Sequence, residues 1–413
     1  MIQFNINSEI GKLQAVLVHE PGPEVENMSP ATAERALYSD ILNLSVASKE
    51  YKQFKEVLKK FTTVFEIKDL LNSVINIQEA KNQFISDLVA YAGNPFLADQ
   101  LMRLSNEEFC TQIIEGVPLN QKSLRNFLHR DRYLISPLHN AFFARDSSFV
   151  IGNTAYIGNM AKKIREPETI LMNILLNYYP DFNGEVELLS PAISINSQYS
   201  TAEGGDILVV AGDVLLIGIG NRSSSQGVDD LISQILQKRD LHFVIVQELP
   251  DKPESFIHLD MVFTLLNIDE CMIYKPLLLD ENTYHTVLMH IENREIVRIE
   301  YTDNILKGLK KAGHDLKPIP CGGSELLLQE REQWHSGANF LAIDPGKIIG
   351  YGRNIHTAEE LNKNGYEIRK AEDLIKSDLT IEDLGKTLIT IDGSELSRGG
   401  GGARCMSMPL ARE

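Results

Sequence analysis

The sequence predicts an α/β fold built from a repeated strand–turn–strand unit, and two observations support this prediction. First, pairs of β-rich apolar runs flank short turns of Gly, Asn, Asp or Pro, which is the signal of a β-hairpin. Second, the hairpins recur about every 60 residues with helical segments between them, as in proteins made of stacked repeats. The four hairpins are expected at Phe149–Ile157, Ile207–Ile219, Val262–Tyr274 and Phe340–Tyr351.

The other elements follow the same plan. An N-terminal run, Leu13–His19, precedes the turn residues Pro21-Gly22 and is expected to begin the first unit. Between this unit and the second, residues 68–132 are rich in Leu, Glu, Lys and Asn at helical spacing, and we interpret them as an inserted helical module. No low-complexity linker divides the chain, so residues 1–413 are expected to form a single domain. Helices between the later units are expected at Glu166–Tyr178, Ser225–Gln237 and Thr302–Ala312.

Composition excludes several classes of partner. The formal net charge of −17 disfavours binding to nucleic acid or to anionic membranes, because both need a basic surface. The first 12 residues lack a long apolar core, so no signal peptide is expected, and no run reaches the roughly 18 apolar residues of a transmembrane helix. The cysteines form no CxxC pair, which disfavours structural zinc and a disulfide framework and favours a reducing cytoplasm. They are Cys110, Cys271, Cys321 and Cys405.

Acidic residues and a histidine occupy equivalent places before three of the hairpins. Asp146 stands just before the second unit, Glu203 before the third, and His258-Leu259-Asp260 before the fourth. Equivalent positions in a repeat lie at one end of the assembly, so we expect these side chains to converge on one cleft. Their shared position distinguishes them from ordinary surface charges.

A second regularity involves two arginines. Asp146 precedes Arg165 by 19 residues, and Glu203 precedes Arg222 by the same 19. Both arginines follow the second strand of their hairpins, so each repeat is expected to bring one acid and one arginine to the same rim. We expect Arg165 and Arg222 to bind a substrate carboxylate.

The C-terminal segment contains four consecutive glycines followed by Cys405. Such a run permits positive φ angles and close approach of the backbone to a ligand, although a flexible tail has the same composition. A phosphate-binding loop is disfavoured because no GK[ST] follows. The sequence contains no HxH or HExxH spacing, which disfavours a metal site, and no GxSxG turn, which disfavours a serine hydrolase. Cys405, with a histidine elsewhere in the chain, fits a nucleophile and its acid–base partner.

These residue types suit attack on the planar, cationic carbon of a guanidinium group. Carboxylates bind a guanidinium through paired hydrogen bonds, so Asp146 and Asp260 are expected to hold its nitrogens. Cys405 would attack the carbon as a thiolate favoured by nearby positive charge from the substrate or His258. His258 would then protonate the departing ammonia and activate water. Glu203 is expected to orient His258 or a guanidinium nitrogen.

The ordered motifs FARD, EGGD, HLD and a glycine-rich loop ending in RCMSMP resemble those of arginine deiminases. The segments Ser8–Leu13, Arg331–Asn339 and Ala342–Asn354 also resemble that family, so the resemblance covers nearly the whole chain. It implies a single catalytic domain with the five-bladed α/β propeller of the guanidine-modifying (pentein) superfamily, made of ββαβ repeats. It also implies no metal or organic cofactor and a homo-oligomer. The implied reaction is hydrolysis of free L-arginine to L-citrulline and ammonia through a covalent cysteine thiouronium intermediate.

The resemblance also assigns residues to roles. The catalytic roles fall on Cys405, His258, Glu203, Asp146 and Asp260. The substrate-binding roles fall on Asn140, Phe143, Arg165, Arg222 and Gly399. The family loop usually reads SRGRGG, and its second arginine helps to bind the substrate, whereas this chain has Gly400 there. Loss of one charge-assisted hydrogen bond costs about 1.5–3 kcal/mol, or roughly 10- to 150-fold in affinity.

Gly400 therefore leaves other substrates open. One alternative is hydrolysis of another alkylguanidine, such as agmatine or a methylated or acylated arginine, and a second is amidino transfer. Agmatine is disfavoured if Arg165 and Arg222 face the site, because agmatine has no carboxylate. A non-catalytic binding protein is disfavoured because it would not need Cys405, His258 and Glu203 together.

Overall fold

The four predicted hairpins are confirmed in the computed structural model, which describes residues 1–30, 33, 38, 40–119, 123–128, 132–189, 200–281 and 283–413. Each hairpin is an antiparallel pair, as the alternation of apolar runs and tight turns predicts. The pairs are β6 (Ser148–Ile151) with β7 (Thr154–Ile157), β10 (Ile207–Ala211) with β11 (Val214–Ile219), β13 (Phe263–Asn267) with β14 (Glu270–Ile273), and β18 (Leu341–Asp344) with β19 (Lys347–Tyr351).

A third strand joins each hairpin in parallel with its second strand. Parallel pairing needs a long crossover, and this accounts for the helices between the second and third strands of each unit. The third strands are β9 (Glu185–Leu188), β12 (Phe243–Glu248), β17 (Lys317–Pro320) and β21 (Thr387–Ile391). The crossover helices are α10 (Glu166–Tyr178), α11 (Ser225–Lys238), α12 (Lys275–Leu278) with α13 (Ile305–Lys311), and α15 (Ile355–Lys363) with α16 (Ala371–Lys376).

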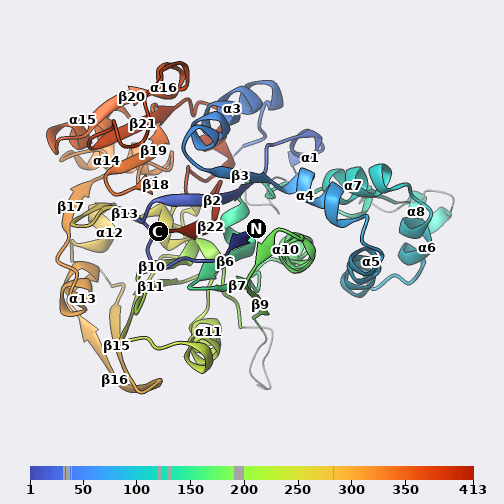
Figure 1. Ribbon diagram of the computed structural model, residues 1–413, viewed down its shortest axis with the longest axis horizontal. Helices are drawn as coiled ribbons and strands as arrows, with labels where there is room; N and C mark the ends of the chain where they lie inside the picture. Colours follow the sequence, from blue (N-terminus) through green and yellow to red (C-terminus); the bar gives the residue numbers. More distant parts are fainter. Residues whose placement is uncertain are drawn as a thin grey trace.

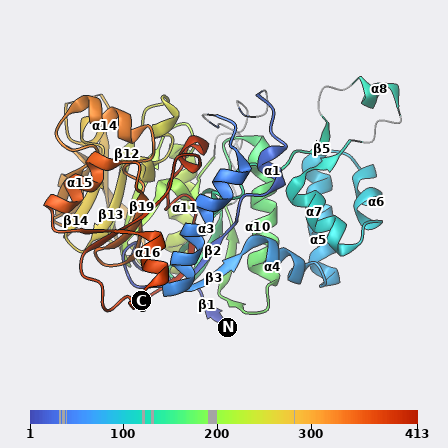
Figure 2. The same cartoon turned by 90° about the horizontal axis from the view of Figure 1, so that it is seen from above.

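The N-terminal strand obtains its antiparallel partner from the other end of the chain. β2 (Leu13–Val18) pairs with β22 (Met408–Arg412) and, in parallel, with β3 (Thr63–Glu66), which follows α3 (Leu44–Phe61). The predicted start of a unit at Leu13–His19 is therefore confirmed, but the two ends of the chain complete that unit together. Among the described residues, five sheets thus share one pattern, and both termini lie on one face of the molecule, near the centre of the view in Figure 1 and at the lower edge in Figure 2.

Other strands extend these sheets or stand apart. β15 (Thr286–Glu292) and β16 (Glu295–Thr302) form a hairpin that adds to β12, and β20 (Glu367–Lys370) adds to β21. Thr302 ends β16, and the Asn304 side chain caps α13, so this helix is shorter than the predicted Thr302–Ala312. Two small sheets remain, β1 (Ile2–Gln3) with β8 (Phe182–Asn183) and β4 (Val117–Pro118) with β5 (Tyr133–Ile135).

Helices gather on one side of the molecule, away from α14 (Leu326–Gln333) and α15, as Figures 1 and 2 both show. They lie within or next to the expected helical module of residues 68–132, of which residues 120–122 and 129–131 lie outside the described residues. None of the helices in the described ranges is long and apolar enough to cross a membrane. The gathered helices are α4 (Ile67–Val74), α5 (Gln78–Ala92), α6 (Phe96–Met102), α7 (Asn106–Glu115) and α8 (Leu124–Phe127).

The first strands of neighbouring units meet where β22 lies against β6 and β13 against β18, and β18 also contacts β2, the second strand of its unit. A short helix precedes the first strand in three units, and these helices contact one another in turn. They are α9 (Ala144–Ser147) before β6, η3 (Gly204–Asp206) before β10, and η5 (Leu259–Met261) before β13. The acidic residues and the histidine singled out in the sequence lie on these short helices or directly before them: Asp146 in α9, Glu203 before η3, His258 before η5 and Asp260 in η5.

Candidate active site

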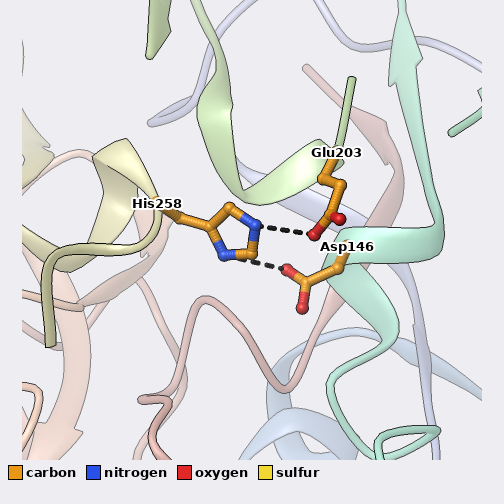
Figure 3. Close-up of side chains that lie close together, drawn as sticks. All are labelled: Asp146, Glu203 and His258. Carbon is orange, nitrogen blue, oxygen red and sulfur yellow. Dashed lines mark hydrogen bonds and ion pairs between the residues drawn. The ribbon is translucent and has the colours of Figure 1, made fainter. Parts of the chain in front are cut away.

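His258 lies between two carboxylates that come from two other units (Figure 3). Its Nε2 is 2.9 Å from Glu203 Oε2, and its Nδ1 is 3.6 Å from Asp146 Oδ1. All three side chains are buried, as expected if the short helices bring them to a common centre. The 2.9 Å contact is a hydrogen bond, whereas the 3.6 Å contact is an ion pair without one.

Charge controls the protonation of this cluster. Burial alone would lower the pKa of His258, but the charge of Asp146 and the hydrogen bond to Glu203 outweigh burial and raise that pKa to about 9. Burial would raise the pKa of Glu203, but Arg222 and His258 outweigh burial and lower it to about 2. At neutral pH the cluster therefore contains an imidazolium and a carboxylate, and His258 holds a proton that it can donate.

The two arginines spaced 19 residues from their acids contact those acids directly. Arg165 Nη1 donates to Asp146 Oδ2 at 2.7 Å, and Arg222 Nη1 donates to Glu203 Oε2 at 3.4 Å. Glu168, one turn along the helix from Arg165, also accepts from its Nε and Nη2 at 3.0 and 2.8 Å. Both guanidinium groups, expected to bind a substrate carboxylate, are thus held by carboxylates of the chain itself.

Cys405 lies beside Asp260, the other carboxylate of the HLD motif. Its Sγ is 3.6 Å from Asp260 Oδ2 and accepts a hydrogen bond of 3.1 Å from Asn339 Nδ2. Burial, together with the charges of Asp260 and Asp146, raises the pKa of the Cys405 thiol well above its usual value. The thiolate expected from nearby positive charge is therefore disfavoured here, because burial and the two carboxylates outweigh the opposing charge of Arg404.

Arg404 fixes Asp260 through Oδ2, the same carboxylate oxygen that lies nearest the thiol. Its Nη1 donates to Asp260 Oδ2 at 2.8 Å, and its Nε and Nη2 each donate to Glu9 at 3.0 Å. Burial alone would raise the pKa of Glu9, but Arg404 and Arg145 lower it to about 2. Arg404 is therefore committed to two buried carboxylates.

Four residues of this region were not predicted to have a role. Glu168 holds Arg165, Asn339 contacts the thiol, and Glu9 anchors Arg404. Asp206 of the EGGD motif accepts from Leu259 N and from Ser223 Oγ, which itself accepts from Glu203 N. Asp206 thus connects the backbones beside His258 and Glu203. Three of the four lie in segments that carried the family resemblance, and Glu168 follows Arg165 at a helical spacing of three.

The glycine-rich loop packs against aromatic rings. The rings of Phe142 and Phe143 lie 4.0 Å apart, and Phe143 is next to Gly401, where an added Cβ would lie 2.4 Å from Phe143 Cε1. Gly399, in the short helix η6 (Leu396–Gly399), is also buried against both rings. Asn140 is buried, and its carbonyl accepts from Phe143 N at 2.9 Å.

Gly400 follows η6 with a φ of +89°, in the left-handed region that favours glycine. A side chain at position 400 would therefore strain the backbone. Arg398, at the same loop, instead pairs with Asp40 and with Glu395. The family motif has an arginine at position 400. Arg398 and Arg404 do not replace this cation, because their guanidinium groups already pair with carboxylates of the chain.

The ligand atoms of Asp146, Glu203 and His258 lie within 4.8 Å of one another, which is close enough to surround a metal ion. Each nitrogen of His258, however, already faces a carboxylate oxygen, and a ligating imidazole must be neutral. The contacts among these three side chains are those of an ion-pair cluster.

Comparison with known proteins identifies the family. The sequence model of the arginine deiminase family matches residues 34–412. The arginine deiminase of Oenococcus oeni is 31% identical over 428 residues, covering 99% of this chain and 97% of that protein. The arginine deiminase of Listeria monocytogenes serotype 4b is 32% identical over 430 residues, covering 99% of this chain and 98% of that protein.

Solved structures of other guanidine-modifying enzymes share the fold. An amidinotransferase from Microseira wollei has a TM-score of 0.56 at 14% identity, covering 99% of this chain and 97% of that one. DDAH from Pseudomonas aeruginosa, complexed with citrulline, has a TM-score of 0.52 at 14% identity, covering 96% and 99%. The chain has a mixed α/β fold of the pentein type, belongs to the arginine deiminase family, and is a hydrolase that cleaves C–N bonds of linear amidines.

Proposed function

We propose that this protein hydrolyses free L-arginine to L-citrulline and ammonia, with Cys405 as the nucleophile. One observation carries the proposal: the thiol of Cys405 contacts Asp260, and Asp260 lies two residues from the imidazolium of His258 in the turn that begins η5. A nucleophile, a proton donor and carboxylates for a cationic substrate therefore occupy one buried region. The family membership of the chain supports the same reaction.

Substrate binding would replace existing ion pairs with new ones and would leave no buried charge without a partner. The substrate guanidinium would replace Arg165 on Asp146 and would also contact Asp260 Oδ1, the carboxylate oxygen not held by Arg404. The released Arg165, with Arg222, would then bind the α-carboxylate of arginine. Such an exchange limits the electrostatic cost of entering a buried site, because each charge retains a partner.

The same exchange would activate the thiol. Asp260 and Asp146 add to the effect of burial in raising the pKa of Cys405. A bound guanidinium neutralises both carboxylates and places a positive charge beside Sγ, so the pKa of Cys405 falls and the thiolate forms. The nucleophile would thus be generated only when a cationic substrate is present.

The chemical steps balance with groups that the chain provides. Sγ forms a bond to the guanidinium carbon, and His258 donates its proton to one amino group, which leaves as ammonia when its C–N bond breaks. The product is a thiouronium on Cys405. His258, now neutral, removes a proton from water, whose oxygen attacks the same carbon. The C–S bond then breaks and the hydroxyl group of the adduct releases its proton to solvent, which gives neutral citrulline and the Cys405 thiolate. Glu203 holds the imidazole in place throughout.

We propose that the five sheets are the blades of a five-bladed α/β propeller made of ββαβ repeats. The contacts of β22 with β6, β13 with β18 and β18 with β2 support this arrangement. In this proposal residues 1–413 form one catalytic domain, with residues 68–132 as an inserted helical module. The short helices α9, η3 and η5 would then face the propeller axis, where the substrate binds.

The test is an assay of purified protein with L-arginine, in which citrulline and ammonia are both quantified. We expect equal release of the two products, abolished in Cys405→Ala and retained in Cys110→Ala, a matched change at a buried cysteine of α7. Cys405→Ser is expected to lose turnover with its circular dichroism unchanged. Product from agmatine or methylarginine but not from arginine would contradict the proposed substrate, and turnover by Cys405→Ala would contradict the proposed nucleophile.

A further inference from the structure

β16 is an edge strand with exposed apolar side chains. It ends a five-stranded sheet, and its only partner among the strands of the described ranges is β15. Ile299 is 60% exposed and Tyr301 is 72% exposed, on the face that also contains Val287 and Met289 of β15. Large apolar side chains beside an unpaired strand edge mark a surface that binds another chain.

The edge is poorly protected against pairing. β16 contains neither proline nor lysine, the residues that most often block an edge strand. Its register against β15 shifts between Ile296 and Arg298, and from Arg298 to Thr302 the pairing is regular. The whole strand is eight residues long, which is enough to template an added strand.

The order of residues in β16 complements itself. In an antiparallel pair of two β16 strands with Ile299 opposite Ile299, Arg298 of each copy faces Glu300 of the other, and Val297 faces Tyr301. Shifting the centre by one residue in either direction places two Glu300 or two Arg298 side chains opposite each other. A centre between two residues places charged side chains against apolar ones.

We infer that β16 pairs with β16 of a second copy of this chain across a two-fold axis through Ile299. A two-fold interface requires a surface that complements itself, and β16 meets this requirement in charge and in apolar contact. The chain carries a net charge of −17, so two copies repel over most of their surfaces, whereas Arg298 and Glu300 balance each other here. Pairing would join two five-stranded sheets into one continuous sheet.

Charge reversal tests the register. Arg298→Glu places two pairs of glutamates across the axis, and Glu300→Arg places two pairs of arginines there. In sedimentation velocity, each single variant is expected to raise the dimer dissociation constant about tenfold or more. The double variant Arg298→Glu/Glu300→Arg restores both opposite-charge pairs and is expected to recover the wild-type constant. Single variants that dimerise normally, or a double variant that remains as weak as the singles, would overturn the inference.

The apolar contact gives a second test. Ile299→Lys is expected to make the protein monomeric at concentrations where the wild type is dimeric, with unchanged circular dichroism. The matched control is Ile268→Lys, because Ile268 is also exposed (74%) but lies in the turn between β13 and β14. The control is expected to dimerise like the wild type. A wild-type protein that is monomeric throughout the micromolar range, or an Ile299→Lys variant that dimerises normally, would overturn the inference.

Discussion

Two buried histidines in this protein each lie between two carboxylates, and they differ in how tightly those carboxylates enclose them. His19, directly after β2, is 3.1 Å from Glu66 through Nδ1 and 3.2 Å from Glu24 through Nε2. His258 has one hydrogen bond, to Glu203, and a looser contact of 3.6 Å with Asp146. Among the described residues, Asp146 Oδ1 has no hydrogen-bond partner.

The difference separates a structural ion cluster from a reactive one. At His19 the two carboxylates satisfy both ring nitrogens, and Lys55 adds a further cation to Glu66 at 2.8 Å. Around His258, the Oδ1 atom of Asp146 accepts no hydrogen bond from the described residues, and Cys405 lies in the same buried region. A histidine between acids therefore does not identify a catalytic site by itself, but incomplete pairing next to a nucleophile supports one.

The largest expected effect is on turnover. His258→Gln removes the proposed proton donor, so kcat for arginine hydrolysis is expected to fall about 10²- to 10⁴-fold. His19→Gln, measured at a temperature where it remains folded, is expected to retain kcat within a few-fold. Steady-state assays of both variants decide this, and similar losses of kcat would show that the two clusters do not differ in function.

The free energy of unfolding should depend more strongly on His19 than on His258, the reverse of the order expected for turnover. His19→Gln leaves Glu24 and Glu66 buried without their shared cation, and its free energy of unfolding at pH 7 is expected to fall by about 3–5 kcal/mol. Hydrogen bonds to Glu24 and Glu66, together with the charges of these two glutamates, outweigh burial and raise the pKa of His19 to about 10, above the unfolded value of 6.5. The stabilisation is therefore complete below pH 6.5 and lost as pH rises through 10.

Urea denaturation at several pH values measures this effect. The gap between wild type and His19→Gln should narrow as pH rises from 7 toward 10. A gap that is constant over this range, or absent at pH 7, would contradict a charged His19.

The third prediction concerns the pH profile of the proposed active site. His258 must be protonated to release ammonia, and its pKa is raised from 6.5 to about 9, so kcat/KM should fall as pH rises through 9. Glu203→Gln removes one cause of that rise and should move the basic limb toward lower pH. The exposed pair Glu248–His285 supplies the control, because Glu248→Gln should leave the profile unchanged. An unmoved basic limb in Glu203→Gln would contradict the coupling to His258.

The smallest effect is expected at the glycine-rich loop. Gly400→Arg supplies the cation that the family motif has there, and KM for arginine is expected to fall about tenfold. The φ of +89° makes any side chain costly, by about 1–2 kcal/mol, so Gly400→Gln is the control with similar strain and no charge. Equal KM values in the two variants would show that position 400 does not contact the substrate carboxylate.

Local patterns in the sequence predicted much of the fold. The hairpins were predictable because each is a short apolar pair around a turn, and α10 has its predicted bounds, Glu166–Tyr178. The pairing of β2 with β22 was not predictable, because the two strands are separated by almost the whole chain and no local signal connects them. Local patterns did not locate the third, parallel strands, because each pairs with its hairpin across a helical crossover; only the ββαβ repeat implied by the family resemblance included them.

The site was predictable where position in the repeat carried information. The spacing of 19 residues correctly placed Arg165 beside Asp146 and Arg222 beside Glu203. It did not reveal that these acids already occupy the arginines, because a spacing gives proximity and not the geometry of an ion pair. The His19 cluster was missed because Glu24 and Glu66 belong to no repeated position.

The most direct test is whether Cys405 becomes covalently attached to the substrate. Wild-type protein and the His258→Gln variant would be mixed with arginine, quenched in acid within the first turnover, and analysed by mass spectrometry. We expect a peptide containing Cys405 whose mass has increased by that of arginine less one ammonia, and we expect no such peptide from Cys405→Ala. Citrulline formation in the wild type without any such adduct in either protein would contradict the account.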